Sequence, residues 1–434
     1  MSSVLPYLIN GQATPSELWS MYLQEVRKPY QKLARMDFLQ PDGSIAFSLD
    51  NNPKNKRSGA FIQDGILDVN LQNGQRRKST VLLSNLNSEY EFAINKIWFG
   101  QQIRIMEGIL LSNGQEFYLP QGVFYVSDPE ETFHPNQKYV SYNLLDKWAY
   151  LDGTLFGNLE GIYEVPLNTN IPTVVASILA LDRGNGYPVD YVSPIFSSYW
   201  NDKTVTLESG ETISVLLTPY TYRCDAFGGS YADVLLEMNT MLVGWIGYDQ
   251  TGHLRLDPGD DDILDTSKPV LWTFTPTERE FLGATYSPKI TQVYNDIIVV
   301  GQALDNDPTP MGRATNMDPR SDTNIYSSLG RRTLRKEATA YYATEQCQQY
   351  AAYTLKRNTI IKKSVSISSA QLFHINENSL VQVRRPDKQG SPTERHLVTG
   401  FSRPLTGTEN MTINCTSVQD FPEATFTPLP GDEN

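Results

Sequence analysis

The chain has 434 residues, with 36 lysines and arginines against 49 aspartates and glutamates. The net charge of −13 argues against sequence-specific nucleic-acid binding, because an acidic surface repels phosphates. Three widely spaced cysteines exclude a disulfide framework and a zinc–cysteine site, and predict buried thiols in a reducing compartment.

The length exceeds that at which one hydrophobic core usually stops growing, so several domains are expected. The N-terminal sequence has no basic segment followed by an apolar run, and no stretch approaches about eighteen uninterrupted apolar residues. We therefore expect a protein made in a cytoplasm, without membrane insertion.

The first 150 residues predict a short helix followed by a β-barrel. Residues 1–30 form an N-terminal helical segment that starts at Pro15 and ends before Pro29. From residue 31 apolar residues alternate with polar ones, and Pro41-Asp42-Gly43 and Asn73-Gly74 mark two tight turns. Short strands with such turns predict a first antiparallel barrel over 31–150.

The sequence then changes character. Residues 151–270 contain a helix that opens at Ile171-Pro172 and is ended by Gly184, a second helix from Ser230, and a hairpin turning near Gly252. This pattern predicts a mixed α/β module.

The remaining chain predicts a second barrel with an excursion. Residues 271–304 and 360–420 supply strands of this barrel, while 305–359 form a loop and a helix from Thr344 that pack on the middle module. The loop over 305–324 is too long for an ordinary connection, so we expect it to be mobile or held by a partner. Residues 421–434 are predicted to be disordered.

An internal sequence repeat links the two predicted barrels. Shifting Ile97–Asp146 forward by 278 positions without a gap places Ile103 on Val381 and Gly122 on Gly400. The predicted fold is therefore mainly β with an α+β insertion: two related tube-like antiparallel barrels and a helix-and-hairpin module.

Catalytic patterns are sparse. His134, His253, His374 and His396 stand alone, and neither HExxH nor GxSxG occurs. Gly184-Asn185-Gly186 and Gly228-Gly229-Ser230 lack the strand and lysine of a phosphate loop, so we interpret both as turns. The run Asp257–Asp265 misses key EF-hand positions and is interpreted as a solvated turn, with metal binding left open. We predict no catalytic residue, cofactor or metal site.

Basic and aromatic clusters are candidate contacts. Two of the basic groups are interpreted as residues that keep hairpin bends soluble: Lys54, Lys56 and Arg57 form one, and Arg76, Arg77 and Lys78 form the other. A third group, next to the 305–324 loop, is the better candidate for an acidic partner surface and comprises Arg331, Arg332, Arg335 and Lys336. Aromatics such as Trp98, Phe99, Trp148, Tyr150 and Phe156 are interpreted as core, with a docking role as the alternative.

Four passages carry a family resemblance. They are SNLNSEYEFAINKIWFGQQIRIMEG, LPQGVFYVSDPEETF, YNLLDKWAYLDGTLFGN and SPTERHLVTGFSRPLTGTENMTI. In their order and spacing the chain resembles phage tail or baseplate hub proteins, a class with the T-even baseplate hub and the N-terminal part of tail-associated proteins of Gram-positive phages. The passages leave the middle module largely uncovered.

The resemblance implies a non-enzymatic structural protein of the phage virion. Such a hub is a homotrimer whose two barrels per subunit make a pseudo-sixfold ring, which joins the tail tube to the tip and lets DNA pass during ejection. Its implied partners are tail-tube, distal-tail, tape-measure and tip or fibre proteins. The implied ring-forming strands contain Ile97, Trp98, Phe99, Ile103, Ile105, Leu380, Val381 and Val383. No further domain follows the second barrel, so wall-degrading activity is expected on other chains.

Two other classes remain open. A carbohydrate-binding adsorption protein would stack sugars on aromatics of the middle module such as Tyr199, Trp200 and Trp245. A glycoside hydrolase would need two inward-facing carboxylates about 5 to 10 Å apart in the acidic middle module.

Overall fold

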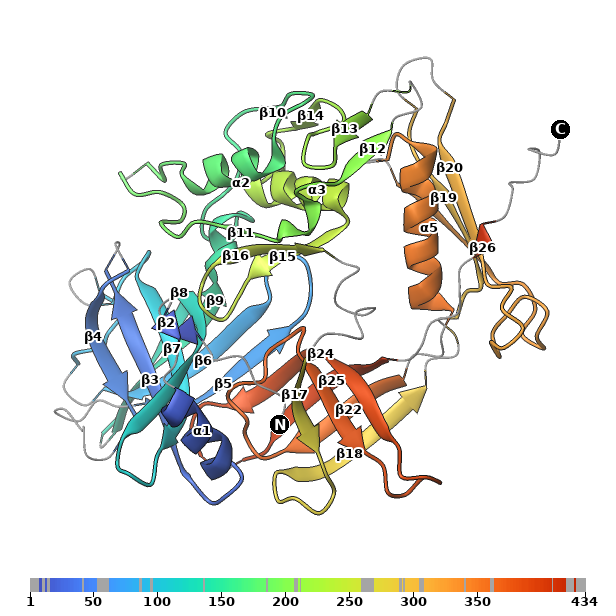
Figure 1. Cartoon of the computed structure of the whole chain (residues 1–434). Coiled ribbons are helices and arrows are strands. Elements are labelled where there is room, and N and C mark those ends of the chain that lie inside the picture. Colours follow the sequence, from blue (N-terminus) through green and yellow to red (C-terminus); the bar gives the residue numbers. More distant parts are fainter. Residues whose placement is uncertain are drawn as a thin grey trace.

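The structure is a computed structural model of the whole chain (Figure 1). The residues it describes are 8–9, 12–13, 16–40, 43–52, 62–85, 88–93, 97–135, 137–184, 186–206, 210, 212–258, 269–288, 291, 293–303, 308–338, 341–359, 363–407, 409–418 and 425–426. The fold is mainly β, with a large and almost wholly antiparallel sheet, as predicted.

The first half of the large sheet is built by seven strands. Their order is β5-β6-β9-β8-β7-β3-β4, with all neighbours antiparallel. Alternating apolar residues bury one face, as the period of two predicts. The bounds are β3 Gln31–Leu39, β4 Ile45–Asp50, β5 Ile62–Asn70, β6 Arg77–Ser84, β7 Gln102–Leu110, β8 Glu116–His134 and β9 Gln137–Asp146.

The second half contains six strands from the C-terminal part of the chain. They are β17 Val270–Phe274, β18 Phe281–Pro288, β22 Lys363–Ser369, β23 Leu380–Arg384, β24 Thr393–Pro404 and β25 Met411–Val418. Their order is β18-β22-β25-β24, with β23 on β24 and β17 parallel to β23.

The two halves are one continuous sheet, which corrects the expectation of two separate barrels. β24 pairs with β23 and β25 and then, over Gly400–Pro404, with Ile66–Asn70 of β5. A Cβ at Gly400 would lie 2.4 Å from the Val69 carbonyl oxygen, so glycine permits this close approach. The pairings of the described strands close no barrel.

The internal repeat is present in the topology of the strands but not in their register. β7-β8-β9 and β23-β24-β25 are both three-stranded antiparallel meanders. Ile103 lies opposite Phe124, 21 positions on, whereas Val381 lies opposite His396, only 15 positions on. The gap-free shift of 278 is therefore wrong for the whole hairpin, because the second turn is shorter.

The middle module lies above the large sheet (Figure 1). Its helices are α2 Ile171–Leu179 and α3 Tyr231–Leu242, which opens with a Ser230–Asp233 capping box. The sequence predicted that Gly184 ends α2, but the helix already ends at Leu179. The short elements are η2 Lys147–Tyr150, β10 Tyr163–Val165, β11 Ile195–Phe196, η3 Ser198–Trp200, β12 Thr204–Thr206, β13 Thr212–Ser214, β14 Tyr222–Cys224, β15 Gly244–Tyr248 and β16 Leu254–Pro258.

The module is fixed to the large sheet by buried polar contacts. The β5–β6 turn reaches β15, where Gly74 N donates to the Ile246 carbonyl at 3.0 Å. Lys147 Nζ, just after β9, lies 2.5 Å from the buried Asp190 carboxylate and 2.9 Å from the Gly252 carbonyl oxygen. Buried polar groups with partners in fixed directions set one relative orientation of sheet and module.

A second, four-stranded sheet corrects the predicted domain boundaries. Its order is β21-β19-β20-β26, with β19 Asp296–Val300, β20 Met311–Thr315, β21 Thr333–Glu337 and β26 Thr425–Phe426. β19 was expected in the second barrel and β26 lies in the tail expected to be disordered. Helix α5, Thr344–Asn358, starts as predicted and covers one face through Cys347, Ala351 and Leu355.

The 305–324 excursion contains β20 and a loop anchored by its own chain. Asn295 Nδ2 donates to the Thr323 and Gly330 carbonyls at 3.1 and 2.7 Å. Thr323 Oγ1 donates to the Thr359 carbonyl at 2.5 Å. Intramolecular hydrogen bonds thus hold this loop.

The N-terminal strands β1 Leu8–Ile9 and β2 Gln12–Ala13 precede helix α1, Ser16–Glu25, which packs on the large sheet. Trp19, Tyr22 and Val26 are buried, as their stripe predicts. Tyr22 Oη lies 2.9 Å from His374 Nδ1 and accepts a hydrogen bond from Phe373 N at 3.1 Å. α1 therefore fastens the segment before β23 to the first half of the sheet.

A buried ionic network, the Glu107–Arg403 network, joins the two halves. Arg403 of β24 donates to Glu107 Oε2 of β7 from Nε at 2.8 Å and Nη2 at 2.5 Å, and to Gln121 Oε1 at 2.6 Å. Lys32 Nζ lies 3.1 Å from Glu107 Oε1, and burial lowers the Lys32 pKa to about 8, opposed by Glu107. Arg77 pairs with Glu377 in the same interior. Charges this buried must be matched by partners in fixed places.

We expect Arg403→Met to lower the free energy of unfolding by about 3–5 kcal/mol, because Glu107 stays buried after losing two charge-assisted hydrogen bonds. Urea denaturation followed by tryptophan fluorescence measures this. The matched control is Arg223→Met, whose side chain is 60% exposed and pairs with Glu164; it should cost less than about 1 kcal/mol. Equal losses in both variants would show that the network does not stabilise the fold.

We also expect stability to fall on acidification through His374. Burial, with repulsion from Arg403 and Arg27, lowers its pKa to about 3, whereas the unfolded chain binds the proton near the ordinary value of 6.5. Between about pH 6.5 and pH 3 the unfolded state binds more protons, so this group removes at most about 1.4 kcal/mol per pH unit.

Urea denaturation from pH 7 to pH 4.5 tests this expectation. His374→Gln should show a shallower fall of stability with pH than the natural chain. His134→Gln, at an exposed histidine on β8, is the control and should keep the full slope. Parallel slopes for all three proteins would contradict the assignment.

Candidate interaction surfaces

The histidines do not assemble a catalytic or metal site. Among the described residues, no three histidine, cysteine, aspartate or glutamate side chains converge in a way that would hold a metal ion. His134 is exposed, His374 and His396 are buried, and His253 Nδ1 lies 2.8 Å from Thr251 Oγ1 in a hairpin turn. Asp257 pairs with Arg255, whereas most of the 257–265 run lies outside the described residues.

The glycine-rich segments and the cysteines, which could have marked chemical sites, have structural roles. Gly184, Gly186 and Gly228 adopt positive φ in turns, as interpreted from the sequence, and Ser230 caps α3. Cys224, Cys347 and Cys415 are buried free thiols. None of the helices in the described ranges is long and apolar enough to span a bilayer.

Six of the expected ring contacts are core residues of this chain. Their side chains are buried and belong to, or border, the core shared by both halves of the sheet: Ile97, Ile103, Ile105, Leu380, Val381 and Val383. β7 and β23 each have strand neighbours on both sides. These side chains therefore pack inside this chain.

Trp98 and Phe99 are exposed. Their side chains are 37% and 57% accessible and pack with Phe92, at ring distances of 4.7 Å for Trp98 and 4.8 Å for Phe99. We call these three residues the aromatic corner. Rigid aromatic side chains gathered on a surface are typical of protein contact sites. Trp148 and Tyr150, by contrast, are buried, which confirms their interpretation as core.

The basic group at 331–336 lies along β21, an edge strand of the four-stranded sheet in the described residues. Arg331 and Arg335 are exposed. Arg332 instead stacks over Tyr294, and Lys336 Nζ lies 3.3 Å from Tyr350 Oη. Two of the four cations are thus directed to solvent, where they can meet an acidic surface.

The interpretation of the basic residues at the β5–β6 bend as a solvated loop is wrong. Arg76 and Arg77 are buried, and only Lys78 is exposed. The backbone N–H groups of Arg76 and Arg77 both donate to Asp146 at 2.8 Å. Lys54, Lys56 and Arg57 lie outside the described residues.

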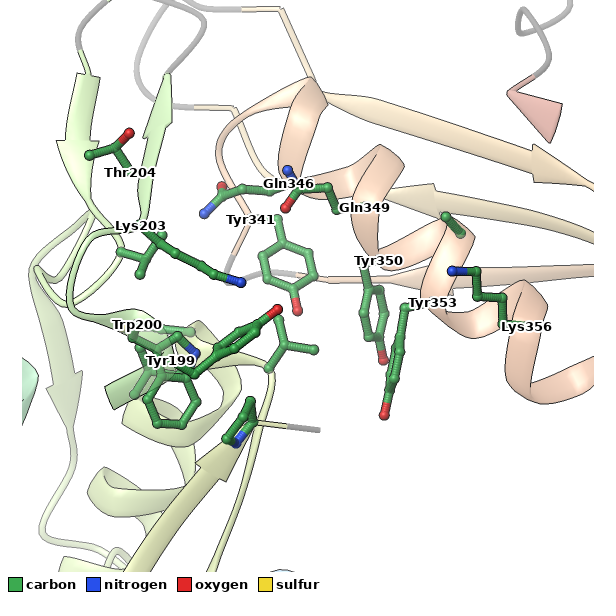
Figure 2. Close-up of a pocket in the computed structure, with 16 residues that line it drawn as sticks. Tyr199, Trp200, Lys203, Thr204, Tyr341, Gln346, Gln349, Tyr350, Tyr353 and Lys356 are labelled. Carbon is green, nitrogen blue, oxygen red and sulfur yellow. The ribbon is translucent and has the colours of Figure 1, made fainter. Parts of the chain in front are cut away.

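A cleft of about 580 Å³ opens between the middle module and α5 (Figure 2). We call it the tyrosine cleft. Tyr199, Trp200 and Lys203 come from the middle module, while Tyr350 and Tyr353 come from α5. The other lining residues are Thr204, Val215, Met241, Leu242, Val243, Pro258, Tyr341, Gln346, Gln349, Ala352 and Lys356.

The cleft combines residues that sequence reasoning named with residues it missed. Tyr199 and Trp200 were proposed as sugar-stacking aromatics and line the cleft, but Trp245 does not. Tyr341, Tyr350 and Tyr353 were not anticipated. They lie about 150 positions away along the chain, and only the packing of α5 beside the middle module brings them near Tyr199.

No protein-family model matches the sequence, and no significantly similar curated protein is found. Solved structures do match, at low identity. The tail protein from Neisseria meningitidis MC58 aligns with a TM-score of 0.56 and 9% identity over 89% of this chain and 97% of that one.

Two prophage proteins align similarly. The 43 kDa tail protein of prophage MuSo2 from Shewanella oneidensis gives a TM-score of 0.53 and 13% identity, over 89% of this chain and 98% of that one. The prophage tail protein gp18 from Listeria monocytogenes EGD-e gives 0.51 and 8%, over 89% and 94%. The resemblance expected from the sequence is thus confirmed for the fold, and the chain has the fold of phage tail proteins.

Proposed function

We propose that the chain is a structural hub of a phage tail tip or baseplate, without enzymatic activity. The observation that carries the proposal is the shared fold along 89% of the chain with three phage tail proteins. In this function the chain is a virion component whose partners are tail-tube, distal-tail, tape-measure and tip or fibre proteins.

The finer proposal is a homotrimer. Each subunit carries two β-meanders of the same topology, β7-β8-β9 and β23-β24-β25, in the two halves of its large sheet. Three subunits would then present six similar β-surfaces, which suits a ring that joins a sixfold tube to a threefold tip. The pseudo-sixfold ring requires similar surfaces, and the unequal hairpin registers do not prevent that.

Charge supports passage of DNA through such a ring. A chain with net charge −13 repels phosphates, so a lumen lined by this protein would not retain DNA. The exposed Arg335 of β21 and Arg331, just before that strand, are proposed contacts for an acidic partner, away from the large sheet.

The aromatic corner is the proposed subunit contact within the large sheet. Trp98 and Phe99 expose large apolar surfaces directly before β7, in the segment that the family resemblance marks as ring-forming. Burying such rings at an interface provides much of the binding energy in protein complexes.

We expect size-exclusion chromatography with light scattering to give three times the 48.9 kDa chain mass, either for the chain alone or after addition of its tail-tube or distal-tail protein. Phe99→Asp should weaken trimerisation by about tenfold or more, because a charge would be buried in an apolar contact. A chain that stays monomeric at micromolar concentration with both partners present would count against the hub.

The matched control is Phe227→Asp. Phe227 is fully exposed, with a relative accessibility of 103% against 57% for Phe99, and it lies in the middle module close to β14. It should leave the trimer intact. Equal weakening by both substitutions would place the contact elsewhere.

A further inference from the structure

The tyrosine cleft has the size and position of a small-ligand site. Its volume of about 580 Å³ falls within the roughly 300–1,000 Å³ typical of ligand pockets, which often form where two structural units meet. One wall belongs to the middle module and the other to α5, and Tyr342 packs against Ile213 and Tyr220 to hold the walls together.

The α5 wall is an aromatic platform. Tyr350 and Tyr353 are three positions apart, so they lie on one face of the helix, and their rings are stacked at 6.1 Å with an interplanar angle of 29°. Tyr341 packs edge-on against Tyr350 at 5.2 Å. Tyr350 and Tyr353 are only partly buried and retain surface towards the cleft (Figure 2).

The opposite wall supplies a cation. Lys203 Nζ lies 3.0 Å from the ring centroid of Tyr199, and Figure 2 shows both side chains reaching towards Tyr341. Lys356 lies beyond Tyr353 on α5. Among the described residues, two lysines and no aspartate or glutamate line the cleft, although the chain as a whole has a net charge of −13. These two lysines would favour an anion in the cleft.

Amides and hydroxyls complete the lining. Gln346 and Gln349 face the cleft from the first turns of α5, and each amide offers both donors and acceptors. Tyrosine and threonine hydroxyls add groups of the same dual kind. This mixture suits a ligand rich in hydroxyls, whose groups also donate and accept.

We propose that the tyrosine cleft binds a saccharide that carries a negatively charged substituent. The apolar C–H face of a pyranose ring would pack on Tyr350 and Tyr353, its hydroxyls would bond to the glutamines, and its acidic group would face Lys203. No carboxylate of the described residues lines the cleft, so the proposal is for sugar binding and not for hydrolysis. The proposal stands independently of the hub function.

A glycan array of matched neutral and acidic oligosaccharides tests the proposal on the purified full chain. The acidic members include sialylated, uronic-acid and phosphorylated forms of the same neutral backbones. We expect binding to at least one acidic member and clearly weaker binding to its neutral counterpart. Titration calorimetry on that pair then gives the dissociation constants.

Three variants assign the binding to the cleft. Tyr353→Ala should raise the dissociation constant about tenfold or more, whereas Tyr353→Phe, which keeps the ring, should change it less than about threefold. Lys203→Gln should remove the preference for the acidic glycan. Tyr326→Ala is the control, because Tyr326 is 75% exposed on another loop and should leave binding unchanged. Circular dichroism checks that each variant folds.

The results that overturn the proposal are distinct. They are no saccharide bound at millimolar concentration, equal affinity for neutral and acidic forms, or binding that survives Tyr353→Ala. Binding of ATP or of a proline-rich peptide in place of all glycans would also overturn it. A monomeric chain that binds an acidic glycan would contradict the hub and leave this inference intact.

Discussion

The interaction on which the architecture depends is the buried ion pair between Glu107 and Arg403. Its partners come from β7 and β24, 296 positions apart, and both side chains are fully buried. Because an isolated charge in such an interior is strongly unfavourable, Arg403 of the second half needs the Glu107 carboxylate of the first half, which Lys32 also contacts. Apolar packing alone would tolerate sliding between the halves. The guanidinium group, fixed also by Gln121 and the Leu372 carbonyl, allows one arrangement.

Local sequence patterns predicted most elements of this fold. The period of two located β3 to β9 and β22 to β25, and caps at Ser230 and a helical stripe after Thr344 located α3 and α5. Grouping of strands was less predictable. β19 is as apolar as a barrel strand, yet it pairs with β20 and β21, whose Arg313 and Thr333 hydrogen-bond to its buried Asp296. Arg76 and Arg77 were assigned to solvent because a pair of arginines at a turn gives no sign of distant carboxylates.

The surface residues, like the strands, were only partly predictable from the sequence. Trp98 and Phe99 were interpreted as core, with docking as the alternative, and are exposed, whereas Ile103 and Val381 were expected at a ring contact and are core. Alternation shows that one face of a strand is buried, not whether the same chain or another buries it. The tyrosine cleft was only half predictable, since its two walls are joined by tertiary packing. Under the two proposals, the large sheet would serve assembly and the two smaller units on one side of it would serve ligand recognition.

The shared strand β24 also has a consequence for biosynthesis. β5 can pair early with β6, but it acquires its second neighbour, β24, only when residues 400–404 leave the ribosome, more than 300 residues after Ile66–Asn70. At roughly 5–20 residues per second the edge of β5 stays open for about 20 to 70 s. During this time its unpaired backbone can associate with other nascent chains. The alternation of exposed and buried residues along β5, with Asp64 and Asp68 on the strand, adds charges that oppose such pairing. These aspartates thus lie on a strand that has an open edge during synthesis and a neighbour on each side in the folded sheet.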